Sequence, residues 1–443
     1  MDGSARPADG KGRAVLLIGQ GDLADETEHA LEADGADVTR LTGEDEQEVR
    51  DAIERGAPDT VTIVARSDAI VLRLALLARS VDEEVQLLLT IFDPTMADHV
   101  SRQIENAHVT SLADIVAPSL AGPCIDERYT AVELDRDPPA ALIDDGDDVR
   151  EEPLEVEHGS RLGRLARAVV TPFDRSGALL LYGAVGLLLV LLVEIVMTMI
   201  VVDAKPVDAI YKSAKALVTV GPNDAVEKGP AWFKLFIAAT VLIAFVFAAA
   251  FTAGLVNRVI DRRLTGVLGA RSVPRRNHVV VVGLGQVGLR LCLVLRRCGV
   301  PVVAVELSDD GESVGLARKM DLPVVIGRGA DPSLLERLSL EHARAVAAVT
   351  AEDLENIQIA MAAQSVHPDV RVVLRVGDGQ VANESRSLLS LGIVRDVHRI
   401  AGALLAAMAT SGDAESVVCL GDHAHVRFAD GRLERAEIDV LAS

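Results

Sequence analysis

The chain has 443 residues, which is too long for one ordinary domain, so two or three folded units are expected. Its formal net charge of −22 argues against a nucleic-acid partner, because nucleic-acid binding needs basic surfaces that release counterions. Hydrophobic residues make up 49% of the sequence, which indicates membrane segments and sheets rich in Ala, Val and Leu. The four cysteines show no CxxC spacing, so reduced thiols and no metal site are expected.

Residues 1–12 have no apolar core, so they are expected to be a disordered N-terminus and not a secretory signal. Residues 13–130 alternate apolar strands with helices, which predicts a doubly wound parallel sheet of the Rossmann type. Gly19, Gly21 and Ala24 form a G-x-G-x-x-A turn after the first strand, the geometry by which backbone approaches a phosphate. The next strand ends VTRLT without an acidic residue for a ribose. This first domain is therefore expected to be a degenerate copy that has lost its ligand.

Residues 131–176 are acidic and interrupted by prolines, which predicts a solvated linker that ends in a juxtamembrane segment.

The middle of the chain, residues 177–257, holds two long apolar segments at 178–202 and 235–256. Each is long enough to cross the hydrocarbon core of a bilayer as a helix. Arginines precede the first segment and follow the second, which favours a cytoplasmic position for both large soluble parts. The sequence therefore predicts a multi-pass protein of the plasma membrane with both soluble domains in the cytoplasm.

Between the two spans, residues 208–224 read DAIYKSAKALVTVGPND. This segment resembles the pore helix and filter of potassium channels with two membrane helices per subunit. Ala209, Ile210, Tyr211 and Ser213 match the pore helix. The predicted selectivity filter consists of Val218, Thr219, Val220, Gly221, Pro222, Asn223 and Asp224.

The resemblance implies K⁺ as the permeant ion, held by rings of backbone carbonyls from four subunits. Pro222 and Asn223 depart from the T-V-G-Y-G-D pattern, where an aromatic residue and a second glycine stand. Pro222 has no N–H and a fixed φ, so the outer part of the filter is expected to differ while the inner ion sites remain.

Three charged residues accompany this pore module: Glu194 in the first span, and Lys212 and Lys215 on the pore helix. An ionisable residue inside a membrane usually has a partner, so one hypothesis pairs Glu194 with Lys215 or Lys212 behind the filter. In the alternative, Glu194 reaches toward the headgroups and both lysines face water.

A basic linker at 258–276 leads to a buried strand, three glycines that open a helix, and a second strand that ends in Glu306. Gly283, Gly285 and Gly288 form the G-x-G-x-x-G of a dinucleotide site, and Glu306 can accept from ribose hydroxyls. In the alternative, the fold has no ligand and keeps its glycines for packing.

Residues 277–410 resemble the regulator-of-K⁺-conductance (RCK) domain, also called the TrkA N-terminal type. Arg328 stands where that family commonly has an aspartate, and its guanidinium could meet a phosphate, which leaves NAD(H), ATP, ADP and cyclic dinucleotides open. The resemblance implies a nucleotide site formed by Gly283, Gly285, Gln286, Val287, Gly288, Glu306, Arg328, Asp331, Thr350 and Asp353. Residues 411–443 are expected to form a small β appendage.

An internal repeat joins the two ends of the chain. The segment from Thr60 aligns without gaps with the segment from Ala345, and Asp68 falls on Asp353. Val71 replaces Asn356, and the first copy is shorter in the region of the third strand. Each chain thus carries one degenerate and one intact RCK-like domain on either side of the two-helix pore hairpin.

These features predict a homotetrameric, ligand-gated potassium or cation channel in a lipid bilayer, in which a cytoplasmic ring of RCK domains responds to a nucleotide. Gly254 is a candidate gating hinge, or it serves helix packing. Two alternatives are a non-conducting nucleotide sensor and a regulatory subunit of a potassium transport system. An oxidoreductase is disfavoured, because no catalytic constellation accompanies the glycine turn.

Overall fold

The computed structural model describes residues 13–65, 67–134, 138–145, 149–154, 175–217, 230–264, 274, 276–377, 391–420 and 423–439. It divides into two compact units. The first combines Met1–His158 with Arg271–Ser443, and the second is Gly159–Ala270. The two soluble halves expected on either side of the hairpin therefore form one unit. Met1–His158 is called the first half and Arg271–Ser443 the second half.

The first half holds a parallel sheet in the order β2-β1-β3-β4-β5. Its strands are β1 (Ala14–Gly19), β2 (Asp37–Leu41), β3 (Thr60–Val64), β4 (Gln86–Thr90) and β5 (Ala107–Thr110). The connecting helices are α1 (Asp22–Ala33), α2 (Glu46–Gly56), α3 (Asp68–Val81) and α4 (Pro94–Gln103). Strand β3 is buried along its whole length, as a parallel strand covered on both faces should be.

The second half holds a parallel sheet in the order β11-β10-β9-β12-β13-β14. Its strands are β9 (His278–Val282), β10 (Val302–Glu306), β11 (Val324–Ile326), β12 (Ala343–Ala348), β13 (Arg371–Val376) and β14 (Ile393–Asp396). The helices are α11 (Gln286–Arg297), α12 (Glu312–Lys319), α13 (Pro332–Arg337), η1 (Leu340–His342) and α14 (Asp353–Val366). The prediction of doubly wound, Rossmann-like parallel sheets is confirmed.

The two sheets are copies of one pattern, because β2-β1-β3-β4-β5 corresponds to β10-β9-β12-β13-β14. Among the strands of the described residues, β11 has no counterpart in the first sheet. The region shortened in the first copy of the repeat is thus the region of this strand.

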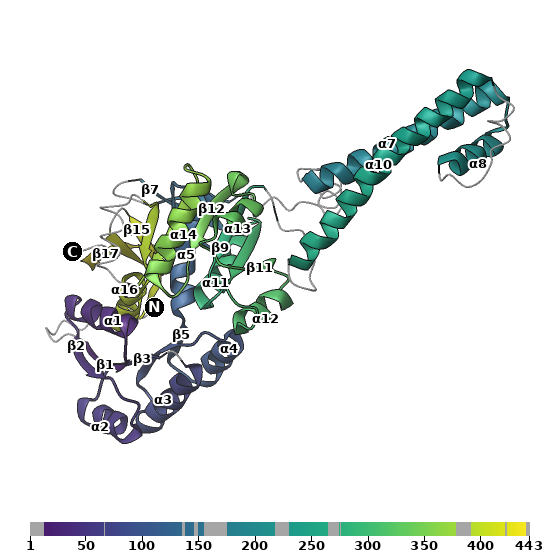
Figure 1. Ribbon diagram of the computed structural model, residues 1–443. Helices are drawn as coiled ribbons and strands as arrows, with labels where there is room; N and C mark the ends of the chain where they lie inside the picture. Colours follow the sequence, from purple (N-terminus) through teal and green to yellow (C-terminus); the bar gives the residue numbers. More distant parts are fainter. Residues whose placement is uncertain are drawn as a thin grey trace. The chain divides into compact units, whose positions relative to one another are not determined.

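The halves exchange their last helices. Helix α5 (Leu112–Ile125) follows the first sheet but packs on α11, β12 and β13 of the second half (Figure 1). Helix α16 (Val397–Ser411) follows the second sheet but packs on α1, β3 and β4 of the first half. The contact of α16 with α1 is close, because a Cβ on Gly402 would lie 2.8 Å from the backbone of Glu26. The Thr60 hydroxyl also donates to the Ala409 carbonyl at 3.0 Å.

After its exchanged helix, each half continues into a small antiparallel sheet. The first contains β6 (Tyr129–Glu133), β7 (Ala140–Asp144) and β8 (Val149–Pro153), and the second contains β15 (Ala414–Leu420), β16 (His423–Phe428) and β17 (Leu433–Asp439). The two sheets pack together through Ala131, Leu142 and Val418. The interpretation of residues 131–176 as a linker is therefore wrong for residues 131–133, 140–144 and 149–153, because this apolar contact orders the acidic segment.

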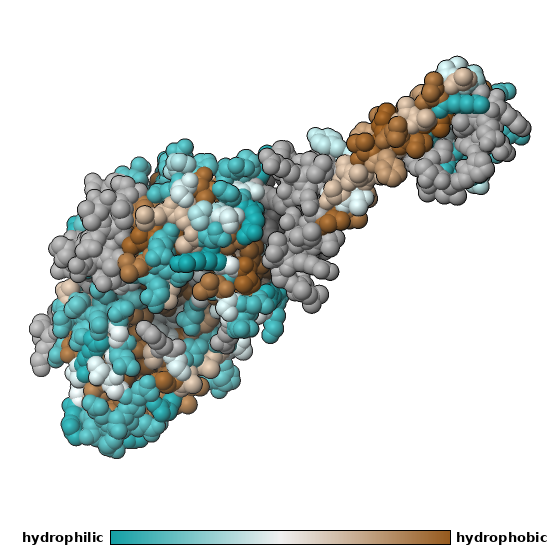
Figure 2. All heavy atoms as spheres, viewed as in Figure 1, coloured by the Kyte–Doolittle hydropathy of each residue, from teal (hydrophilic) through white to brown (hydrophobic). Residues whose placement is uncertain are grey.

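The second unit is a helical hairpin formed by α7 (Arg175–Val202), α8 (Pro206–Leu217) and α10 (Ala231–Leu264). Leu181–Val202 and Ala231–Val256 are long and apolar enough to cross a membrane. Figure 2 shows the apolar side chains that cover this hairpin. Helix α10 continues to Leu264, so the first part of the expected basic linker is helical.

All four cysteines are free and buried. Burial raises the pKa of the Cys124 and Cys292 thiols to about 12 and that of Cys298 to about 11, which makes these thiolates scarce at neutral pH.

Candidate functional site

The glycine turn of the second half lies at the point where the strand order reverses. Strand β9 pairs with β10 on one side and with β12 on the other, and all three are parallel. The turn from β9 into α11 therefore opens at the carboxyl edge of the sheet, where ligands of such folds bind.

Each glycine of the turn has a distinct role. Gly283 has φ +95°, and a Cβ there would lie 2.7 Å from the Thr350 nitrogen, so the turn packs tightly against the end of β12. A Cβ on Gly288 would overlap the Gly283 carbonyl oxygen. Gly285 differs, because, apart from its chain neighbours, no atom of the described residues lies within 4 Å of the place where its Cβ would be. This open space lies at the N-terminus of α11, which is suited to an anion such as a phosphate.

Glu306 ends β10 and reaches across the turn. Its carboxylate accepts from the Leu284 N–H at 2.6 Å and from the Leu307 N–H at 2.9 Å. A carboxylate has about four acceptor positions, so Glu306 keeps capacity to accept from a ribose hydroxyl.

The structure does not bring all ten predicted nucleotide residues together. Gly283, Glu306 and Thr350 meet at the turn, while Gln286 is exposed and Val287 is buried in the first turn of α11. Arg328 is exposed on the loop after β11. Asp331 caps α13, where it accepts from the Ser333 hydroxyl at 3.0 Å and from the Ser333 N–H at 2.9 Å, and these bonds lower the pKa of its carboxyl.

A buried amide supports the turn from behind, and it belongs to a residue that was absent from the predicted site. Asn356 is fully buried, and its side-chain oxygen accepts from the N–H and the hydroxyl of Thr350 at 2.9 Å each. Its amide nitrogen donates to the Thr350 and Arg375 carbonyls. The available sequence signal was an amide on the buried face of a helix, where the first copy has Val71.

The Asn356→Val substitution is expected to lower the free energy of unfolding by about 2–4 kcal/mol, because it removes the side-chain acceptor of the Thr350 N–H and the side-chain donor to the Arg375 carbonyl. Denaturant unfolding of the full chain measures the effect. The matched control is Leu354→Val, at an exposed position of the same helix. Equal midpoints for the two variants would show that the amide network contributes nothing.

Asp353 joins the N-terminus of α14 to the loop after β13, since its carboxylate accepts from the Gly377 N–H at 3.0 Å. Its counterpart in the first half does the same, because Asp68 accepts from the Phe92 and Asp93 N–H groups at 3.0 and 2.8 Å. The same bond occurs in the half that is expected to have lost its ligand. This repetition favours a structural role for Asp353.

The glycine turn of the first half lacks the acidic partner. Leu41 pairs with Ile18 as Val305 pairs with Val282, so Thr42 occupies the place of Glu306. The neighbouring Arg40 instead forms ion pairs with Asp25 and Glu28 of α1. In the described part of the first half, the position equivalent to Glu306 therefore has no carboxylate for a ribose.

In the hairpin, Glu194 is fully buried and accepts from the Thr240 hydroxyl at 2.6 Å. Among the described residues, Glu194 Oε2 has no hydrogen-bond partner. The structure thus gives Glu194 a hydroxyl partner on α10 where the sequence suggested a lysine.

The Thr240→Val substitution is expected to lower the stability of the hairpin by about 1–3 kcal/mol, because it removes the hydrogen bond to a buried carboxyl group. The thermal midpoint in detergent measures the effect. The matched control is Thr252→Val, since Thr252 is exposed and, within the described residues, its hydroxyl bonds only to the Ala248 carbonyl of its own helix. A loss of the same size in both variants would contradict the prediction.

Helix α8 contacts α7 through Ser213, whose hydroxyl lies 3.4 Å from that of Thr198. Lys212 and Lys215 are half-buried on α8. The predicted filter, residues 218–224, lies outside the described residues.

Two glycines of α7 allow α10 to approach closely, as small residues do between membrane helices. A Cβ on Gly183 would lie 2.7 Å from the Phe251 nitrogen, and one on Gly186 would overlap the Phe247 ring. Gly254, the candidate hinge, is buried in α10, which continues through it without a break.

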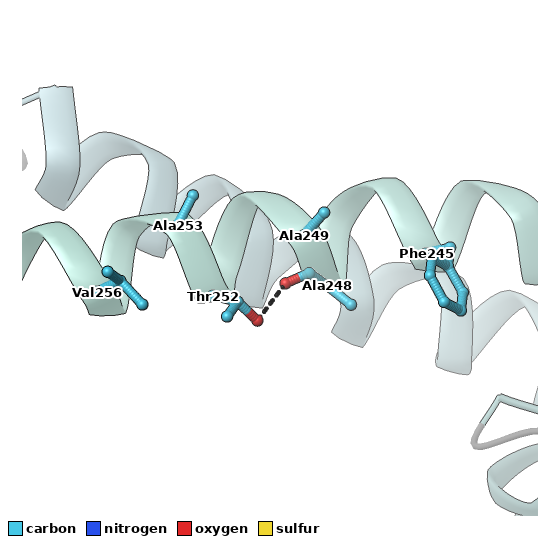
Figure 3. Close-up of a pocket in the computed structure, with 6 residues that line it drawn as sticks. All are labelled: Phe245, Ala248, Ala249, Thr252, Ala253 and Val256. Atoms are coloured by element: carbon cyan, nitrogen blue, oxygen red, sulfur yellow. Dashed lines mark hydrogen bonds between the residues drawn. The ribbon is translucent and has the colours of Figure 1, made fainter.

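The exposed face of α10 carries a shallow groove of about 680 Å³ (Figure 3). Small side chains dominate its lining, which consists of Phe245, Ala248, Ala249, Thr252, Ala253 and Val256. Such a face allows another helix to approach closely.

Comparison with known proteins identifies residues 279–393 as a TrkA-N domain. Potassium channel protein 1 of Methanocaldococcus jannaschii is 22% identical over 44% of this chain and 59% of its own length. The voltage-gated potassium channel Kch of Escherichia coli is 24% identical over 40% of this chain and 43% of its own length. The putative K⁺ efflux antiporter KefB of Alkalimonas amylolytica is 31% identical over 25% of this chain and 16% of its own length. The alignments thus span less than two thirds of these relatives, and the chain is an RCK-containing relative of potassium channel and transport proteins.

Among solved structures, the GsuK channel bound to NAD is 13% identical, covers 91% of this chain and 64% of that chain, and gives a TM-score of 0.49. The NAD(P)-binding domain of an exopolyphosphatase-related protein from Archaeoglobus fulgidus is 28% identical over 27% of this chain and 86% of that chain, with a TM-score of 0.24.

Proposed function

We propose, from the TrkA-N domain at residues 279–393 and the two apolar helices of the same chain, that this protein is a tetrameric potassium or cation channel controlled by a nucleotide. The observation that carries the proposal is the open glycine turn with Glu306 beside it, on a chain that also holds a candidate pore hairpin. In this proposal the protein is a channel and not an enzyme.

The nucleotide is proposed to bind with its phosphates at the N-terminus of α11. Open space at Gly285 admits a phosphate, and Glu306 is placed to accept from the ribose. Arg328, on the exposed loop after β11, supplies positive charge for a further phosphate. These groups suit NAD(H), ADP or ATP.

The proposed topology places both halves of the chain in the cytoplasm. Arg13 donates to the Thr410 carbonyl at 2.5 Å, so residues near both ends of the sequence share one folded unit. A single folded unit cannot lie on both sides of a bilayer, which supports two crossings by α7 and α10.

Four copies are proposed because one hairpin cannot enclose an ion path. The small residues along the groove of α10 would let four such helices approach a common axis. The nucleotide would then act by binding two shapes of the cytoplasmic ring with unequal affinity.

Ion flux from proteoliposomes tests the proposal. Purified full-length protein is reconstituted with K⁺ or Na⁺ gradients, with and without NADH, NAD⁺, ADP or ATP. Flux of K⁺ that depends on a nucleotide supports the channel. The absence of K⁺ flux from a verified tetramer that binds nucleotide would reject the channel.

A non-conducting nucleotide sensor is the second candidate function. It is favoured by Pro222 and Asn223, which stand in the filter segment where an aromatic residue and a glycine are usual. The Pro222→Tyr/Asn223→Gly variant distinguishes the two, because flux that appears only in this variant identifies the natural chain as the sensor.

A further inference from the structure

Among the helix contacts that join the halves of the chain, two are equivalent by the internal repeat. Helix α1 packs on α16, and α11 packs on α5 (Figure 1). In each contact, the first helix of one half meets the exchanged helix of the other half.

The repeat register identifies the equivalent positions within these contacts. Aligning Gly21 with Gly285 places Glu26 on Arg290. Aligning Thr60 with Ala345 places Asp114 on Arg399, and the same register matches the residues that cap the two exchanged helices, Ser111 and Asp396.

The equivalent positions form ion pairs in which the places of the acid and the base are exchanged. Arg290 of α11 pairs with Asp114 of α5. In the other contact, Arg399 Nε of α16 lies 3.7 Å from Glu26 Oε1 of α1. The first half thus supplies both acids, and the second half supplies both bases.

We infer that these reversed charges select the pairing partner, so that a first half accepts a second half and rejects the first half of another copy of the chain. If two first halves exchanged helices, Glu26 would face Asp114. If two second halves did so, Arg290 would face Arg399. Both unwanted pairings set like charges against each other twice, whereas the observed pairing makes two attractions.

The local surroundings hold these charges in place. The Ser111 hydroxyl donates to Asp114 at 2.6 Å, and Arg399 Nε lies 3.6 Å from Asp396 Oδ2. The Arg290 and Asp114 side chains remain 28% and 38% exposed, so the pair adds little stability by itself. Its larger effect is on discrimination, because attraction is replaced by repulsion in the wrong pairing.

The first test measures coupling in the full chain in detergent. Arg290→Glu alone and Asp114→Arg alone each place like charges together, so both are expected to lower the thermal midpoint. The D114R/R290E double variant is expected to lose less than the sum of the two single variants. Additive losses would show that the two charges do not interact.

The second test reads the pairing itself by cross-linking. A Cβ on Gly402 would lie 3.0 Å from the Thr27 nitrogen, and the repeat register places Ala117 on Gly402. In a pair of two first halves, Thr27 of one chain would therefore meet Ala117 of another. Chains with T27C and chains with A117C, distinguished by tag size, are co-expressed at full length and oxidised. A disulfide between the two chains reports like-half pairing, and each cysteine variant expressed alone is the control.

The charge variants make this test decisive. In D114R/R290E, both ion pairs within the chain still join opposite charges. Two like halves would now also join opposite charges, so the cross-linked fraction is expected to rise roughly five- to tenfold. Adding E26R/R399E makes both charges of the first half positive and both charges of the second half negative. Like halves then repel each other again, so the cross-linked fraction is expected to fall. No rise in the double variant, or no fall in the quadruple variant, would overturn the inference. Neither readout depends on nucleotide or ion flux.

Discussion

Gly285→Asp is expected to lower nucleotide affinity by roughly 100-fold without lowering the stability of the protein. The new carboxylate would lie in the open space where the phosphates are proposed to bind, and it would repel them. Folding should tolerate the change, since Gly285 is the N-cap of α11 with φ −73°, and aspartate is a favoured N-cap. Isothermal titration with NADH and ADP measures the affinity.

The matched control is Gly315→Asp, which adds the same charge at another position of the same half, where no described residue beyond its own helix backbone lies within 4 Å of the added Cβ. It should bind nucleotide as the unmodified chain does. If Gly285→Asp bound as tightly as this control, the phosphates would not lie at the N-terminus of α11. The alternative that the glycines serve packing alone would then hold.

Gly183→Leu is expected to abolish recovery of monodisperse protein from detergent, because its side chain would collide with the α10 backbone at Phe251. Size-exclusion chromatography of a fluorescent fusion measures the recovery. Gly186→Leu is expected to fail for a different reason, since its side chain would overlap the Phe247 ring.

This difference supplies the control. Phe247→Ala removes the obstructing ring and should restore recovery of the Gly186→Leu chain, whereas Phe251→Ala leaves the backbone in place and should not restore Gly183→Leu. Recovery of Gly183→Leu without any second substitution would contradict the close approach of α7 and α10.

The sheets and the glycine turn could be predicted because their signals are local. Apolar strands such as β9 lie next to their turn glycines and helices in the sequence, and the acid at Glu306 closes the next strand. The two long apolar helices were equally visible as apolar runs, and only their ends were misplaced, since α10 continues into the basic segment.

The helix exchange could not be predicted, because α5 and α16 are buried on nearly every face. Such sequences show that a helix is buried but not which sheet buries it. Strands β6 to β8 were missed for a related reason, since the apolar cluster that orders them includes Val418 from the far end of the chain. The partner of Glu194 also depended on the rotation of α10, which a uniformly apolar sequence does not fix.

The exchange of α5 and α16 has a consequence for biosynthesis. The face of the first sheet that contains Val15, Leu17 and Leu88 shares its core with Ala403 and Leu404 of α16. A ribosome that adds about 5–20 residues per second delivers α16 only some tens of seconds after β5, and α7 and α10 are made in that interval. The nascent first half must therefore persist with an incomplete core while α7 and α10 are synthesised, and its folding is completed only after α16 has been translated.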